Sequence, residues 1–398
     1  MTVLRRWRPA AIAALIVVVS FAAGIWVQQT FPDRIPALGP SSGVDQRTAQ
    51  QVSGLIQANY YNAPVEPTQL SQGSAKGTVQ SLGDTYSQYL TPEQYRSQLD
   101  ASAGRHQGAI GVSVASAAGR PVVSGVLPNS PALRAGLQPD DVIFAINGRD
   151  TQELTPEQTS AMIRGAAGSS VQLLVNRSGA TKEITVTREN FQSPSVASAV
   201  LNSNLLYLRV YQFGDSTQKE FDDRLDAGLR GARGVVLDLR GNGGGRVDAA
   251  VAMVSRFVAE GEVYEERGRG GHREGVSVDG NHPASGVPLV VLVDRASASA
   301  SEIVAGSLRA HGRATLVGAE TFGKGSVQAN YALADGGGLR LTVQQWFLPD
   351  GRSINGTGLA PDDTVELAQP TGRFDVVHPW RGYASDTQLQ RAIQILGG

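Results

Sequence analysis

The chain has 398 residues, 41% of them hydrophobic and 18% charged, which is enough for two or three domains with their own cores. Its formal net charge of -1 gives no indication of nucleic acid or of an acidic partner. It contains no cysteine, which excludes disulfides, thiolate zinc sites and cysteine nucleophiles. The five histidines lack the spacing of metal ligands, and we expect neither a metal nor another cofactor.

An apolar segment near the N-terminus predicts where the protein works. Residues 10–27 carry no charge and would span ~27 Å as a helix, about the thickness of a bilayer core. Three arginines precede this run and predict that the N-terminus stays in the cytoplasm. A cleaved signal peptide is the alternative, because residues 22–24 resemble a cleavage site, although the run is longer than a usual signal core. We expect residues 1–30 to be a cytoplasmic tip and single-pass membrane anchor, with the remainder outside the cytoplasm, in the periplasm or cell envelope.

Composition then divides the first half of the chain. A Pro/Gly/Ser-rich linker over residues 31–43 precedes a polar segment, 44–104, with the hydrophobic spacing of helices. Within it, Thr91 and Pro92 predict a helix start, as N-cap and first helical residue. Residues 105–190 consist of short β-branched runs separated by Gly and Asn, which predicts a β domain.

The second half of the chain alternates apolar runs with helical patterns. This alternation, over residues 191–370, predicts a parallel sheet with helical crossovers. Residues 371–398 contain an amphipathic pattern at 386–396, which we expect to be a helix that packs on the core or forms a dimer contact. The predicted fold is therefore a mixed α/β and β multidomain chain. It has a membrane-anchor helix, a helical N-terminal segment, a β domain and an α/β core.

Three serines stand where a predicted buried strand turns into a helix, at positions 297, 299 and 301. Ser299 and Glu302 form a capping-box pattern, which gives Ser299 a purely structural explanation worth ~1 kcal/mol. The same position lies at the carboxyl end of a parallel strand and at a helix start, where ligands bind in open α/β sheets. Both explanations of Ser299 remain open on this pattern.

A serine nucleophile needs a base, and His311 would lie roughly 18 Å away along a continuous helix. Lys324 is the other candidate, one of only four lysines in a chain with 31 arginines. Lysine can lose its proton when burial lowers its pKa, whereas arginine cannot. Glycines on both sides permit close approach of backbone and substrate. A solvated lysine in a turn is the alternative.

Two other motifs do not support chemistry. Residues 216–219 match the S-x-x-K pattern of β-lactamase-like enzymes, but the partner motifs are missing and Ser216 fits a helix cap. Residues 240–245 (RGNGGG) superficially suggest a trypsin-like or dinucleotide-binding loop. Gly243 stands where the serine would be, and the third glycine of the dinucleotide pattern falls on Arg246.

Taken together, six ordered motifs between about residues 70 and 365 resemble the C-terminal processing (tail-specific) serine peptidases, peptidase family S41. They are SLGDTYSQYLTPEQY, SPALRAGLQPDDVIFAING, VVLDLRGNGGG, SASASEIVAGSLRAHGRATLVG, TFGKGSVQ and FLPDGRSINGTGLAPD. The resemblance implies a ClpP/crotonase-like protease core over 191–370.

The resemblance also implies roles for individual residues. Ser299 is the nucleophile, Lys324 the base 25 residues later, and Gln328 helps to orient the lysine. The oxyanion hole consists of backbone N–H groups of Gly244 and Ala300. Many relatives have an acidic residue eleven positions after the nucleophile; here that position is alanine, Ala310, so any role of that acid is absent or supplied elsewhere.

The β domain over 105–190 resembles a PDZ domain. Backbone N–H groups of Ala109, Ile110 and Gly111 are then expected to bind a substrate's terminal carboxylate while its tail adds as a β-strand. Relatives usually have glycine at the position of Ala109. A PDZ-like domain that only regulates access is the alternative.

The sequence thus predicts a membrane-anchored serine endopeptidase with a Ser–Lys dyad. We expect it to recognise C-terminal tails of exported proteins or peptides and to cleave them, for processing or degradation, as a possible homodimer or higher oligomer. A catalytically silent PDZ scaffold and a non-proteolytic crotonase-like enzyme are the rival functions. The dyad and glycine loop argue against the first, and the fused PDZ domain argues against the second.

Overall fold

The computed structural model describes residues 46–62, 64–117, 119–367, 373–374, 376 and 382–397. The predicted membrane anchor and the linker at 31–43 lie outside these residues. The chain divides into two compact units, Met1–Ser74 and Ala75–Gly398. None of the helices within the described residues has the length and hydropathy of a membrane span.

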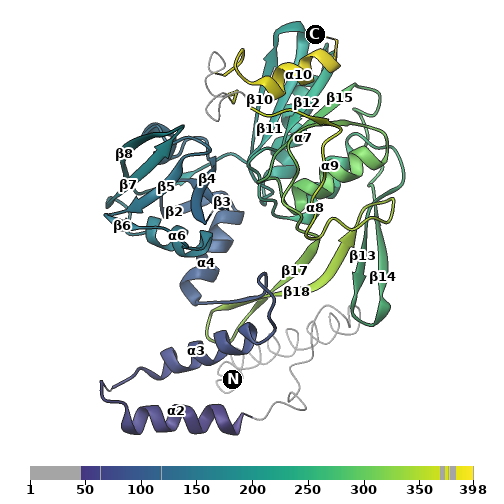
Figure 1. The fold of residues 1–398 in the computed structure, drawn as a ribbon. Helices are drawn as coiled ribbons and strands as arrows, with labels where there is room; N and C mark the ends of the chain where they lie inside the picture. The colour runs from purple at the N-terminus through teal and green to yellow at the C-terminus, as the bar shows by residue number, and fades with distance from the viewer. Residues whose placement is uncertain are drawn as a thin grey trace, which may run out of the picture. The chain divides into compact units, whose positions relative to one another are not determined.

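Over residues 46–62 and 64–104, the segment predicted to be helical contains three helices, which Figure 1 labels, and one short strand. They are α2 (Arg47–Asn59), α3 (Pro67–Gln80), β1 (Gln88–Leu90) and α4 (Pro92–Ser102). The predicted start of α4 is confirmed, because Thr91 is its N-cap and accepts a hydrogen bond from the backbone of Gln94. The Gln94 side chain in turn accepts from the Thr91 N–H, which completes a capping box.

The β domain is built on an antiparallel sheet of order β3-β4-β5-β7-β8, with β6 paired to β5 and a separate pair, β2 and β9. Its elements are β2 (Arg105–Ala109), β3 (Val112–Ala117), β4 (Arg120–Val126), α5 (Pro131–Arg134), β5 (Val142–Ile146), β6 (Arg149–Asp150), α6 (Pro156–Ile163), β7 (Ser170–Arg177), β8 (Ala180–Thr187) and β9 (Glu189–Gln192). Strand β3 is at the edge of this sheet, so one side of its backbone is available for another strand. The core of the domain is aliphatic, with Ile110, Ile143 and Val171 fully buried.

The α/β core contains a six-stranded sheet of order β10-β11-β12-β15-β16-β19. Its elements are β10 (Val196–Leu201), η1 (Asn202–Asn204), β11 (Leu205–Val210), α7 (Thr217–Leu229), β12 (Gly234–Asp238), α8 (Val247–Ser255), β15 (Leu289–Val293), α9 (Ala300–Ala310), β16 (Thr315–Gly318), β19 (Asp363–Thr364) and α10 (Thr387–Ile395). The predicted parallel arrangement is confirmed for β11, β12, β15 and β16.

Helices cover both faces of this sheet because its central strands are apolar on both sides. One core cluster joins alternate strand residues, such as Leu237 and Val291, to α7, α8 and α9. The other faces of the same strands, including Val236 and Val290, pack against α10, where Leu389, Ala392 and Ile393 are the buried apolar residues. The predicted C-terminal helix is therefore present and packs on the core.

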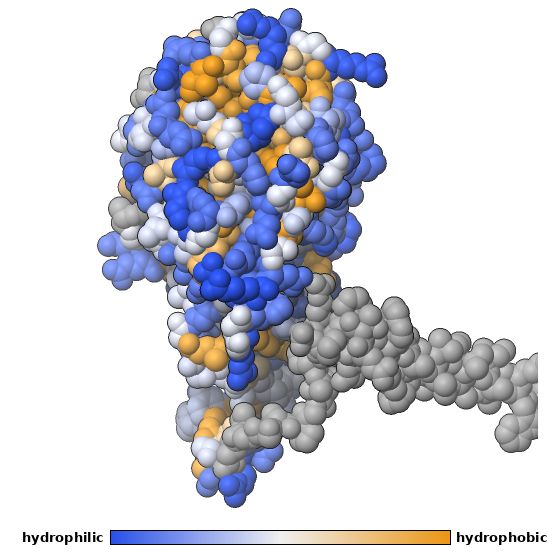
Figure 2. Space-filling view, turned by 90° about the vertical axis from the view of Figure 1, so that its right-hand side faces the viewer, coloured by the Kyte–Doolittle hydropathy of each residue, from blue (hydrophilic) through white to orange (hydrophobic). Residues whose placement is uncertain are grey.

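A second sheet, of order β1-β18-β13-β14 with β17 paired to β18, carries the segment after Lys324. Its remaining elements are β13 (Glu262–Gly268), η2 (Arg269–Gly271), β14 (Arg273–Ser277), β17 (Ser326–Ala332) and β18 (Gly338–Phe347). On the face drawn in Figure 2, hydrophilic residues are mixed with small apolar patches. Single exposed apolar side chains, such as Val200 and Phe322, are ordinary at a protein surface.

Candidate active site

Two turns meet at the carboxyl edge of the parallel sheet, because β12 and β15 are adjacent and in register, with Leu237 opposite Val291. The loop after β12 is residues 240–245, which we call the glycine loop. The turn after β15, residues 294–299, leads into α9 and is called the nucleophile turn. Neighbouring parallel strands thus place the two turns side by side, where open α/β sheets bind their ligands.

Ser299 is the last residue of the nucleophile turn and the N-cap of α9. Its backbone has φ 56° and ψ −116°, a region that costs a residue with a Cβ of the order of 1–3 kcal/mol. The acidic half of the predicted capping box is present, since the Ser299 N–H donates to Glu302 Oε2 at 2.8 Å. The other half of the box places the Ser299 side chain at the Glu302 N–H. Among the hydrogen bonds of the described residues, none is donated by the Ser299 hydroxyl, so this strained turn presents a hydroxyl whose proton is available at the helix start.

The other two serines hold the turns together. The Ser297 hydroxyl donates to the Leu239 carbonyl at 2.9 Å, and the Ser301 hydroxyl donates to the Asn242 carbonyl at 2.9 Å. Both serines are fully buried. Their hydroxyls therefore fasten the nucleophile turn and α9 to the glycine loop, and Ser299 alone of the three is left for chemistry.

Lys324 lies in a loop that Glu302 holds against the start of α9. The buried carboxylate of Glu302 accepts from the Gly323 and Lys324 N–H groups at 2.7 and 2.9 Å, and from the Thr321 hydroxyl at 2.5 Å. The same carboxylate holds the Ser299 N–H, so one side chain connects nucleophile and lysine segments. Burial raises the pKa of Glu302, while these donors act in the opposite direction.

The environment of Lys324 makes its neutral form more accessible than that of a solvated lysine. Burial and the charge of Arg340 together lower the pKa of Lys324 from 10.5 to about 8, although Glu302 and Asp84 pull it upward. The Lys324 Nζ lies 5.2 Å from the ring centroid of Tyr86, which belongs to the segment before β1. A lysine that loses its proton near neutrality is suited to act as a general base.

Gly244 lies directly against the peptide that follows the nucleophile. Its φ is +95°, and a Cβ there would lie 2.6 Å from the Ala298 carbonyl oxygen, 2.8 Å from Ser299 Cβ and 3.0 Å from Ala300 N. The structure thus brings together the two residues predicted to form the oxyanion hole, Gly244 and Ala300. The Gly244 N–H itself donates to Asn242 Oδ1 at 2.9 Å, so it is paired within its own loop.

The other predicted contacts of the dyad are not formed in this structure. The Gln328 amide donates to the hydroxyls of Ser326 and Thr342, at 2.8 and 3.3 Å, rather than to any group of Lys324. Among the hydrogen bonds of the described residues, none joins Ser299 to the Lys324 ammonium. Ala310, where relatives carry an acid, is exposed at the last position of α9.

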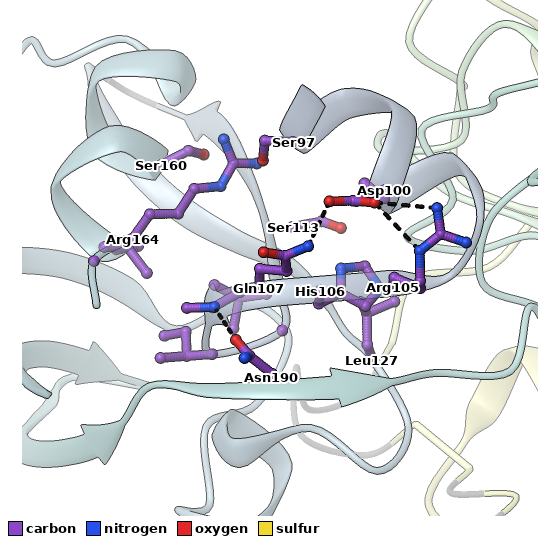
Figure 3. Close-up of a pocket in the computed structure, with 18 of the residues that line it drawn as sticks. Ser97, Asp100, Arg105, His106, Gln107, Ser113, Leu127, Ser160, Arg164 and Asn190 are labelled. Atoms are coloured by element: carbon purple, nitrogen blue, oxygen red, sulfur yellow. Dashed lines mark hydrogen bonds and ion pairs between the residues drawn. The ribbon is translucent and has the colours of Figure 1, made fainter. Parts of the chain in front are cut away.

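A pocket of about 1010 Å³ connects the β domain to the glycine loop (Figure 3). The residues predicted to bind a carboxylate, Ala109, Ile110 and Gly111, all line it, as do Gly243 and Gly244. The backbone at position 109 belongs to the end of β2 and has no positive φ, so alanine meets no conformational penalty there. The predicted carboxylate loop and the predicted oxyanion loop thus open into the same space.

No motif in the sequence indicates a role for Arg164, which follows α6 and also lines this pocket. Figure 3 shows its side chain extending among the lining residues. Burial lowers the pKa of Arg164, and no carboxylate of the described residues pairs with its guanidinium. Arg164 is exposed to solvent within this pocket. An arginine without a carboxylate partner, beside the predicted carboxylate loop, is suited to bind an anionic group of a ligand.

Comparison with known proteins identifies the same family and the same two domains that the sequence motifs resemble. A model of peptidase family S41 matches residues 204–365, and a PDZ domain model matches residues 122–177. The chain is 33% identical over 315 residues to the carboxy-terminal processing protease CtpA of Bacillus subtilis, covering 78% of this chain and 67% of that protein. It is 32% identical over 366 residues to the carboxyl-terminal-processing protease of Synechocystis, covering 90% and 84% of the two chains.

The fold agrees with these sequence matches. The solved structure of a photosystem II D1 C-terminal processing protease is similar, with a TM-score of 0.66 and 26% identity. The similarity covers 86% of this chain and 94% of that one. The chain therefore belongs to peptidase family S41, as a C-terminal processing serine protease with a PDZ domain.

Proposed function

We propose that this protein is a membrane-anchored endopeptidase that binds the C-terminal tails of exported proteins through its PDZ domain and cleaves them with Ser299 and Lys324. The observation that carries the proposal is the shared pocket. A tail held by its carboxylate at residues 109–111 extends toward Gly244, and Gly244 touches the nucleophile turn.

The chemistry follows from the groups around Ser299. Neutral Lys324 removes the hydroxyl proton, and Ser299 Oγ attacks the peptide carbonyl to give a tetrahedral intermediate. The protonated lysine then donates this proton to the leaving amine as the peptide C–N bond breaks, which leaves an acyl-enzyme and a neutral lysine. Backbone N–H groups of Gly244 and Ala300 stabilise the oxyanion. Water then hydrolyses the ester, with Lys324 again accepting the proton.

Two contacts that this mechanism requires are not formed among the described residues. The Gly244 N–H is paired with Asn242, and the Ser299 hydroxyl has no bond to Lys324. Catalysis therefore requires the Gly244 N–H to turn toward the substrate and the lysine to approach the serine.

The decisive experiment uses an unstructured protein with a small apolar C-terminus, incubated with the full-length enzyme in detergent. We expect fragments by mass spectrometry with the free carboxylate, and much slower cleavage when the C-terminus is amidated. The Ser299→Ala variant should bind the substrate without cleaving it. Binding without cleavage by the wild type would instead support the silent scaffold, and cleavage independent of amidation would contradict recognition of the carboxylate.

The anchor is tested separately. We propose that residues 10–27 remain in the membrane and that residues 44–398 lie outside the cytoplasm, because the apolar run exceeds a signal core. N-terminal sequencing of the mature protein should recover the start of the chain from the membrane fraction. A sequence that begins after Ala23 or Gly24 would show that the segment is a cleaved signal.

A further inference from the structure

A buried ion network joins the glycine loop to the C-terminal segment. Arg240, the first residue of the loop, is 1% exposed. Its guanidinium binds both carboxylate oxygens of Asp386, at 2.9 and 2.8 Å, and also donates to Gln388 Oε1 at 2.8 Å. Asp386 and Gln388 lie at the start of α10, some 146 positions away in the sequence.

The network is balanced in charge. Arg240 also donates to Asp238 at 2.7 Å, and Asp238 accepts from Arg209 at 2.9 Å and from the Tyr207 hydroxyl at 2.5 Å. Burial alone would raise the pKa of Asp238, but Arg240 and Arg209 hold it well below its usual range. Two cations therefore face two anions, so the loss of either anion leaves an uncompensated buried charge.

The C-terminal segment makes a second contact, with the nucleophile turn. Arg373 donates to Asp294 Oδ2 at 2.8 Å. The other oxygen of Asp294 accepts from the N–H groups of Gly241, Ala296 and Ser297, at 2.9, 3.0 and 3.0 Å. Asp294 thus orders the turn that ends at Ser299 and ties it to the glycine loop.

The two contacts belong to one piece of structure. The Phe374 N–H donates to Asp386 Oδ2 at 2.9 Å, so the residue next to Arg373 is fixed to the same carboxylate that binds Arg240. The apolar face of α10 already packs the helix on the sheet. Apolar contacts are therefore sufficient to dock α10 on the sheet. Buried ion pairs contribute little net stability, so this network is better explained by a need to fix the geometry of the loops that it joins.

We propose that Arg373 and Asp386 are positioning residues for catalysis, which hold the nucleophile turn and the glycine loop in register through Asp294 and Arg240. This inference rests on the proposed function of Ser299 and Gly244, and it adds the C-terminal segment to the machinery of that site. Neither positioning residue is among those that line the pocket.

The test compares two Asp→Asn substitutions. One is at the N-cap of α10, and the other is at a residue that forms an ion pair with α10. Asp386→Asn keeps the shape and the acceptor for the helix start but removes the charge that faces Arg240. Asp363→Asn is the control, because Asp363 binds Arg391 of α10 in a partly exposed pair at 2.5 Å. Each enzyme is titrated with a fluorophosphonate that labels active serines, and kcat is expressed per labelled site.

We expect Asp386→Asn to lower kcat per labelled site about a hundredfold, with KM for a tail peptide changed less than about threefold. Asp363→Asn should match the wild type. A purely structural role would reduce the number of labelled sites and leave the turnover of each site unchanged, which would overturn the proposal.

If Asp386→Asn does not fold, Arg373→Gln takes its place. It removes the links of Arg373 to Asp294 and to Asp140 but keeps the buried pair of Arg240 and Asp386. A normal kcat per site would then contradict the inference. Failure of the wild type to cleave any tail would reject the proposed function, whereas a normal Asp386→Asn enzyme would reject this inference alone.

Discussion

At the scale of single residues, the geometry of the site depends on Ser299, which needs both a strained backbone conformation and a side chain. Ser299 has a positive φ, yet it must keep a side chain, because glycine has no hydroxyl to attack with. The strain is offset by fixed neighbours: the Ser299 N–H binds Glu302, and the Ala298 N–H binds the Asn242 carbonyl at 3.1 Å. Strain of this kind persists where the surrounding structure determines the conformation, and it is concentrated at functional sites.

The strain at Ser299 can be measured by comparing two inactive variants. Ser299→Ala and Ser299→Gly both remove the hydroxyl, but only glycine accepts φ 56°, ψ −116° without cost. We expect Ser299→Gly to have a free energy of unfolding higher by about 1 kcal/mol, after the extra freedom of glycine in the unfolded chain is included. Urea denaturation of both proteins gives this difference. An alanine variant as stable as the glycine variant would show that the turn is unstrained.

The protonation of Lys324 predicts how the rate depends on pH. Only neutral lysine accepts a proton, and its pKa is about 8, so kcat/KM should rise about tenfold per pH unit below that value and level off above it. Lys324→Arg keeps the charge but cannot serve as a base, and we expect a loss of about a thousandfold or more. Initial rates from pH 6 to 10 check both statements. An active arginine variant, or a wild-type rate that is flat across this range, would mean that another group is the base.

At the scale of elements, the glycine loop is shaped by close contact between two turns. Gly244 and Gly243 are neighbours, but their surroundings differ. A Cβ on Gly244 would collide with the backbone of residues 298–300, whereas a Cβ on Gly243 would meet no atom within 4 Å. Alanine at position 244 therefore tests the close contact between the two turns. Alanine at position 243 tests only the loss of glycine from the loop.

We expect Gly244→Ala to lower kcat/KM at least about a hundredfold, because the nucleophile turn must shift away from the oxyanion donors. The free energy of unfolding should fall by about 1–3 kcal/mol, since alanine is also strained at φ +95°. Gly243→Ala should change stability by less than about 0.5 kcal/mol and retain most of the activity. Steady-state kinetics and urea denaturation of the two variants check this. Equal effects of both substitutions would argue against the close contact.

The elements themselves were largely predictable, because their signals are local. Continuous apolar runs indicated the parallel strands β11, β12 and β15, and Thr91 with Pro92 indicated the start of α4. The pairing of Arg240 with Asp386 was not predictable, since no periodicity relates buried charges so far apart in the sequence. The one local hint was a charged pair, Asp238 and Arg240, at the end of an apolar strand.

The candidate active site was likewise only partly predictable from the sequence. Resemblance to a family indicated Ser299, Lys324 and Gly244, but it did not indicate that the Gly244 N–H is paired with Asn242. Glu302 was expected only as a helix cap, although its carboxylate also organises the lysine loop. These are tertiary hydrogen bonds, and a sequence pattern specifies the residue types but not which partners the fold brings into reach.

At the scale of the whole molecule, the residues proposed for tail recognition and those proposed for cleavage belong to different domains that share one pocket. The carboxylate loop lies in the PDZ domain, and the pocket reaches Gly243 and Gly244 of the protease core. The edge strand β3 offers backbone groups along which a tail would add as a strand under the proposed function. Binding energy from the tail, remote from the scissile bond, is then available to orient the peptide at Ser299.

Arg164 allows this coupling between the domains to be tested. If its guanidinium binds the terminal carboxylate of the tail, Arg164→Gln should raise KM about tenfold or more for a free-carboxylate peptide, because a charged hydrogen bond is lost. The same substitution should change KM less than about twofold for the amidated peptide, whose terminus has no charge to lose. Arg134→Gln is the matched control, since Arg134 lies in the same domain but already pairs with Glu189 at 2.5 Å. Peptide kinetics with the four combinations of enzyme and C-terminus give the coupling between Arg164 and the carboxylate. Equal effects of Arg164→Gln on both peptides would mean that the arginine supports the pocket without reading the carboxylate, and recognition would then depend on the backbone loop alone.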